Sequence, residues 1–98
     1  MKYMKVNWIH NFEDEPFAIY GEVNEAMDEQ RKIEIFIDGS FGYSSVNGTE
    51  HRSFMSEVKW SIKEDIEQDP QFKVSYISKE EFEEVWIKAI DATQKKDR

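Results

Sequence analysis

A predicted β-hairpin near the middle of the chain constrains the fold more than any other feature. Apolar and polar residues alternate from Arg31 to Tyr43, and the dipeptide Asp38-Gly39 interrupts the alternation. Alternation is typical of strands that bury one face, and Asp-Gly between two such strands is a strong signal for a tight turn. We therefore expect two antiparallel strands here.

The length of the turn decides the register of this hairpin. A two-residue Asp-Gly turn would place Ile35 opposite Gly42, so that Ile35 would have no apolar side chain as its cross-strand neighbour. A three-residue turn of residues 37–39, with Gly39 in the left-handed conformation, instead pairs Ile35 with Phe41 and Ile33 with Tyr43. We prefer the second register. It leaves Lys32, Glu34 and Phe36 together on the opposite, mixed face.

Four more extended segments are indicated by alternation or by turn residues. A strand is expected over residues 2–10 and another over residues 17–23, separated by a loop whose Pro16 cannot donate a ladder hydrogen bond. Gly21 within the second strand suggests a bulge or a close contact. The dipeptide Asn47-Gly48 predicts a turn before a short extended piece over 49–55, and a last strand is expected over 72–77.

Two helices are predicted from matching start signals. Ser61-Ile62-Lys63-Glu64 and Ser78-Lys79-Glu80-Glu81 both fit a capping box, in which serine and glutamate satisfy the first free amides of a helix. The first helix is short and ends at Asp69-Pro70. The second carries a single apolar stripe with the spacing of a helix face that packs on a sheet: Phe82, Val85, Trp86, Ala89 and Ile90.

These elements predict an α+β fold. We expect a twisted antiparallel sheet of about five strands, with the C-terminal amphipathic helix across one face and the short helix at its edge. Residues 1–92 form one domain and residues 93–98 a frayed tail. The expected single core comprises Met4, Val6, Trp8, Ile33, Ile35, Phe41, Tyr43, Phe72, Val74, Phe82, Val85, Trp86 and Ile90.

Charge and composition narrow the class of partner. The 98 residues carry a formal charge of -8, from 21 acidic and 13 basic side chains, and include no cysteine. Such a field repels phosphate backbones and anionic lipid, so we expect neither nucleic acid nor membrane as a partner. The absence of an apolar leader favours the cytoplasm. An acidic surface complements a basic protein, although this charge is also ordinary for solubility alone.

The order and spacing of many short motifs resemble a known family. They include Trp8-Ile9-His10, Asp14-Glu15-Pro16, Asp38-Gly39, Asp69-Pro70 and Ile77-Ser78 with Glu80-Glu81-Phe82. The chain resembles small bacterial proteins grouped only as a domain of unknown function, and the resemblance spans nearly the whole chain. It implies a stand-alone bacterial cytoplasmic protein and carries no activity. Phe54 to Val58 departs from the family's glycine- and proline-containing stretch, which leaves the path of residues 44–60 open.

Two surfaces are candidates for binding a partner. Glu13, Asp14 and Glu15 are three adjacent carboxylates in a predicted loop, which gain from a cationic partner but also fit an ordinary solvated loop. The mixed hairpin face of Lys32, Glu34 and Phe36 is the second candidate. We expect a non-enzymatic, acidic protein-binding domain, of which a toxin-neutralising (immunity-type) protein is the most concrete version.

A small-molecule-binding or hydrolytic domain is the alternative. It would use His10 with nearby carboxylates such as Glu15, because a histidine beside a carboxylate can act as a base. One histidine before an acidic loop is a poor metal site, and His51-Arg52 has no serine, carboxylate or second histidine at a meaningful spacing in its own element. We therefore assign no catalytic residue, no metal ligand and no cofactor, and the oligomeric state stays open.

Overall fold

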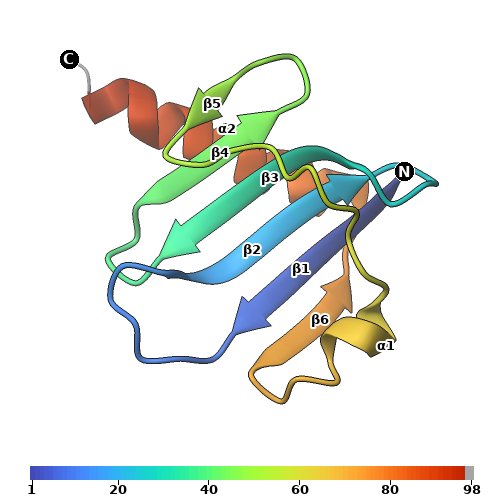
Figure 1. Ribbon diagram of the computed structural model, residues 1–98. Coiled ribbons are helices and arrows are strands. Elements are labelled where there is room, and N and C mark those ends of the chain that lie inside the picture. The colour runs from blue at the N-terminus through green and yellow to red at the C-terminus, as the bar shows by residue number, and fades with distance from the viewer. Residues whose placement is uncertain (97–98) are drawn as a thin grey trace.

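One open antiparallel sheet organises the protein, with a long helix across one face (Figure 1). The computed structural model describes residues 1–96. The strand order is β5-β4-β3-β2-β1-β6, which confirms the α+β class and adds one strand to the five expected. The elements in chain order are β1 (Lys2–Trp8), β2 (Pro16–Val23), β3 (Glu29–Phe36), β4 (Phe41–Ser45), β5 (Glu50–His51), α1 (Lys63–Ile66), β6 (Phe72–Tyr76) and α2 (Lys79–Lys96).

The β3-β4 hairpin adopts the register that the apolar pattern predicts. Ile33 lies opposite Tyr43 and Ile35 lies opposite Phe41. Gly39 takes a φ of 84°, a left-handed conformation that costs glycine little, and its amide donates to the Phe36 carbonyl at 2.9 Å. The three-residue turn is therefore confirmed, and both apolar rows of the hairpin point to one face.

The expectation of a single core is wrong, because the sheet buries apolar residues on both faces. Met4 and Val6 share a face with Val23 and Val74, whereas Ile33 and Tyr43 lie on the opposite face under Phe82 and Ala89 of α2. The registers explain the division: Val6 lies opposite Ile19, and Tyr20, the next residue, lies opposite Ile33. Alternation within one strand identifies its apolar face but does not relate that face to the other strands.

The two helices differ in how they begin. At α2 the Ser78 hydroxyl accepts a hydrogen bond from the Glu81 amide at 3.1 Å, which confirms the serine half of the predicted box. At α1 the N-cap is Ile62 and no side chain caps it, so the box expected at Ser61 is wrong. This helix has only four residues and packs against the edge strand β6, so tertiary contacts rather than a cap hold it.

The C-terminal helix is longer than expected. Residues 93–96, assigned to a frayed tail by the sequence, form its last turn, and residues 97–98 of that tail lie outside the described residues. Neither helix in the described chain has the length and apolar character required to cross a bilayer.

Candidate functional site

The loop between β1 and β2 is held in one conformation by His10. Its Nδ1 accepts a hydrogen bond from the Phe12 amide at 2.9 Å, and its Nε2 lies 2.8 Å from the Pro16 carbonyl oxygen. An amide only donates and a carbonyl only accepts, so Nε2 carries the ring proton and Nδ1 is bare. His10 thereby ties both ends of the loop together.

Aromatic stacking fixes the same loop from the side. The Trp8 and His10 ring centroids are 4.3 Å apart, and those of His10 and Phe12 are 5.3 Å apart. Trp8 in turn stacks on Phe72 of β6 at 5.7 Å, so the row of rings is anchored in the sheet. Phe12 ends this row with 55% of its surface exposed. The loop is therefore ordered, yet it presents a large apolar side chain to solvent.

Charge and apolar surface meet around Phe12. Glu13, Asp14 and Glu15 are exposed, and none of them forms an ion pair with another residue of the described part of the chain. The turn of the β3-β4 hairpin lies at the same end of the sheet (Figure 1), since Pro16 pairs with Phe36. We call this region the loop-end surface, and it comprises Ile9, Phe12, Glu13, Asp14, Glu15, Phe17 and Ile37.

Sequence reasoning identified only the acidic part of this surface. Ile9, Phe17 and Ile37 are 60%, 41% and 56% exposed. The sequence pattern placed Phe17 on the apolar face of a strand and Ile9 at the end of another. Ile9 and Ile37 lie just beyond the ends of β1 and β3, and Phe17 lies at the irregularity between the pairs that Pro16 and Ala18 form with β3. The available signal was a phenylalanine directly preceding three acidic residues in a loop.

The second candidate surface is covered rather than open. Phe36 is buried at 6% exposure, and the Arg52 guanidinium lies over its ring at 3.8 Å. The Lys32 ammonium donates to the Phe54 carbonyl at 2.6 Å, and the Ser53 hydroxyl donates to the Glu34 carboxylate. Residues 52–60 cross the hairpin face of Lys32, Glu34 and Phe36, and Phe36 is buried beneath them.

A buried carboxylate fastens this covering segment, which we define as residues 52–60. Glu29 is 5% exposed, and its two oxygens accept from the Ser56 amide at 2.8 Å and from the Trp60 indole at 2.9 Å. The Lys32 ammonium lies 3.8 Å from the same carboxylate. Trp60 also fills the space above Gly21, where a Cβ would lie 2.4 Å from two carbons of the indole ring. The close contact suggested at Gly21 is thereby confirmed.

A second ionic cluster joins the sheet to α2. Arg31 binds the Glu22 carboxylate through hydrogen bonds of 2.8 and 2.9 Å and also binds Glu83 of α2. Hydrogen bonding to Arg31 holds the pKa of both carboxyls below their usual values, against the opposing effect of burial. Burial, followed by the Glu22 carboxylate, raises the pKa of Tyr3. These groups face one another rather than a cavity, which is the arrangement of a structural ion-pair network.

Among the described residues, His10 forms no hydrogen bond or ion pair with Glu15, its partner in the hydrolytic alternative. Both His10 nitrogens are engaged by the backbone, which leaves no lone pair to take a proton from a substrate. Within residues 1–96, no three side chains of histidine, aspartate or glutamate gather as a metal ion would require. The geometry around His10 is therefore that of a loop clamp.

Comparison with known proteins identifies a family and nothing more specific. No curated protein and no solved structure gives a significant match. One family does match, over residues 2–91, which is nearly the entire length of the chain and includes both the loop-end surface and the covering segment. The chain therefore belongs to the family described as Domain of unknown function (DUF6881).

Proposed function

We propose that this protein is a non-enzymatic binding module that recognises a basic protein through the loop-end surface. The observation that carries the proposal is the ordered 9–15 loop, in which His10 holds Phe12 exposed directly beside Glu13, Asp14 and Glu15. An aromatic anchor beside uncompensated charge is the combination that gives an interface both affinity and orientation.

Order within the loop adds to the affinity that the surface can reach. A mobile loop loses conformational freedom when it binds, and that loss opposes association. Here the loss is already incurred on folding, since two hydrogen bonds and two ring contacts fix the loop. The formal charge of -8 would further speed the encounter with a cationic partner at low salt.

The partner expected from this chemistry is a protein with a basic surface and an apolar recess. The most concrete form of the proposal is neutralisation of a basic toxin, with the acidic loop covering its cationic site. No cofactor is invoked, and the absence of cysteine is in keeping with a cytoplasmic location. The covered hairpin face takes no part in this proposal.

Affinity capture with matched charge variants tests the proposal. The triple variant E13Q/D14N/E15Q removes three charges from the loop, and E57Q/E64Q/E84Q removes three from exposed positions elsewhere. A basic protein should be retained by the wild type and by the second variant, while the first variant and F12S should lose it. The proposal fails if the loop variants retain the same proteins at the same salt concentration as the wild type.

A second step distinguishes immunity from other binding. The captured protein is expressed alone and together with the wild-type chain or the loop variant. Immunity predicts that it arrests growth alone, that the wild-type chain restores growth, and that E13Q/D14N/E15Q does not. If the captured protein is harmless when expressed alone, the immunity version of the proposal fails and the binding proposal stands.

A further inference from the structure

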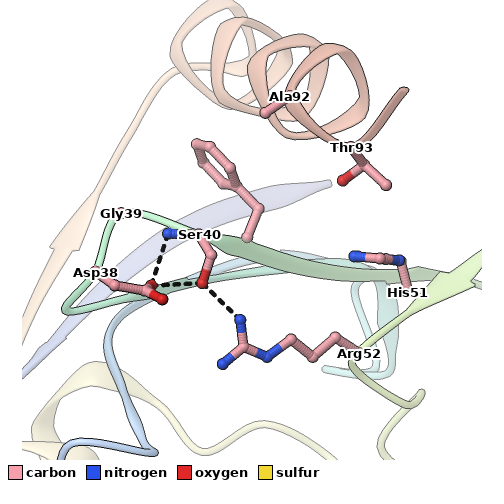
Figure 2. A pocket seen from close by; sticks show the side chains of 8 residues that line it. Asp38, Gly39, Ser40, His51, Arg52, Ala92 and Thr93 are labelled. Atoms are coloured by element: carbon pink, nitrogen blue, oxygen red, sulfur yellow. Dashed lines mark hydrogen bonds between the residues drawn. The ribbon is translucent and has the colours of Figure 1, made fainter. Parts of the chain in front are cut away.

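We infer that this protein has a separate binding site for a small anion, beside the turn of the β3-β4 hairpin. A cavity of about 240 Å³ lies between the β3-β4 turn, β5 and the last turns of α2 (Figure 2). No chemical partner for His51-Arg52 is predicted within its own element. The fold brings Ser40 and Asp38 of the hairpin turn to this pair.

Two contacts fix the Arg52 side chain at this cavity. Its guanidinium lies over the Phe36 ring at 3.8 Å, and its Nη1 donates to the Ser40 hydroxyl at 2.5 Å. That hydroxyl donates in turn to an Asp38 carboxylate oxygen at 2.5 Å, as Figure 2 shows. An arginine held in this way has lost most of its rotamer freedom before any ligand arrives.

The backbone of Arg52 is also held in a conformation that arginine seldom adopts. Its φ is 58°, in the left-handed region. The chain passes so close to Gly42 that a Cβ there would lie 3.2 Å from the Arg52 carbonyl oxygen. Left-handed non-glycine residues persist where surrounding structure enforces them, and they concentrate at binding sites. Here the consequence is that the arginine side chain is directed to the Ser40 side of the cavity.

The free hydrogen-bonding groups of the cavity are mainly donors. The remaining N–H groups of Arg52 and the ring of His51 form no hydrogen bond with other residues in the described range. Thr93 donates its hydroxyl hydrogen to the Ala89 carbonyl, and an Asp38 oxygen already receives both the amide and the hydroxyl of Ser40. The remaining N–H groups of the planar Arg52 guanidinium fit an oxyanion, either a phosphate or a carboxylate.

The size and position of the cavity set the class of ligand. A volume of about 240 Å³ accommodates inorganic phosphate or a short carboxylic acid and is below the usual range for drug-sized ligands. His51 stacks on Tyr43 at 5.4 Å, so its ring is supported from the sheet side. The site uses none of the residues of the loop-end surface, so it is independent of the proposed function.

Titration of the ¹⁵N-labelled protein with phosphate and with succinate, at constant ionic strength maintained by chloride, tests this site. We expect saturable amide shifts at Ser40, His51, Arg52 and Thr93. Shifts with phosphate alone, with succinate alone or with both would support an oxyanion site and identify its ligand group. Absence of saturable shifts with either anion would overturn it.

Three variants give the titration its controls. R52N removes the guanidinium while keeping a residue that tolerates the left-handed conformation, and it should weaken binding about tenfold or more. R52K keeps the charge without the planar fork and should weaken binding less, and it serves as the decisive variant if R52N does not fold. K88Q removes a cation from an exposed position on α2 and should bind as the wild type does. Unchanged affinity in the folded Arg52 variants would overturn the inference.

Discussion

Arg31 on β3 donates two hydrogen bonds, of 2.8 and 2.9 Å, to the carboxylate of Glu22 on the neighbouring strand β2. The same guanidinium binds Glu83 and lies over the rings of Phe82 and Trp86, at 4.8 and 5.1 Å. One arginine therefore connects two strands to the long helix. In the sequence, Glu22 has a polar position of its strand, whereas Arg31 shares the alternation phase of Ile33 and Ile35.

This contact predicts a pH-dependent contribution to stability from Glu22. Arg31 lowers the pKa of Glu22 in the folded protein below the ordinary 4.5, so between the two values the unfolded chain binds more protons. The contribution is thus present above the ordinary pKa and is lost as the pH falls through the lowered one. Urea midpoints at pH 7, 5, 4 and 3 should show the wild type above E22Q, with the gap closing in acid. E80Q, at an exposed position, is the control, and a gap that stays constant with pH would contradict the prediction.

A substitution of Gly21 by alanine should destabilise the protein, against the ordinary preference of strands. Replacing a strand glycine usually helps, but here the new Cβ would lie 2.4 Å from the Trp60 ring. Overpacking of this kind costs about 1–3 kcal/mol. Denaturant unfolding of G21A measures the cost. The loss of unfolding free energy between W60V and G21A/W60V should be smaller than the loss between the wild type and G21A. An equal penalty in both backgrounds would show that Trp60 is not the cause.

The covering segment should loosen when Glu29 loses its charge. Both Glu29 oxygens accept hydrogen bonds from groups that only donate, so the amide of E29Q would turn an N–H toward one of them. We expect a loss of about 1–3 kcal/mol in unfolding free energy and faster hydrogen exchange of the Ser56 amide. The variant E57Q changes an exposed residue of the same segment and should leave both quantities unchanged. Unaltered exchange at Ser56 in E29Q would refute this role.

Removal of the His10 side chain should make the 9–15 loop mobile, although it changes none of the residues of the loop-end surface. H10A removes both hydrogen bonds that close the 9–15 loop and the stacking partner of Phe12. NMR order parameters of amides 11–15 should fall, below about 0.6 for the freest of them. H51A removes the other histidine and should leave these amides rigid. If they stay rigid in H10A as well, the acidic loop is ordered by something other than His10.

The sequence predicted the elements of this fold better than their arrangement. The hairpin register followed from local rules, because turn chemistry and alternation both act within the stretch from Arg31 to Tyr43. The division into two cores depends on how separate strands align, and no local pattern reports that alignment. The candidate site shows the same limit: the acidic loop could be recognised in the sequence, whereas the burial of Phe36 depends on Arg52 and the covering segment, which are distant in sequence.

The two serines that begin matching capping boxes should differ in their effect on stability. Ser78 accepts from the Glu81 amide at the start of α2, so S78A should lower the unfolding free energy by about 1 kcal/mol. Ser61 has the same local motif, but α1 begins one residue later, and Asp65 donates its amide to the Ile62 carbonyl instead. S61A should therefore change stability by less than about 0.5 kcal/mol. Paired urea unfolding curves measure the contrast, and equal losses in the two variants would mean that Ser61 caps α1 in solution after all.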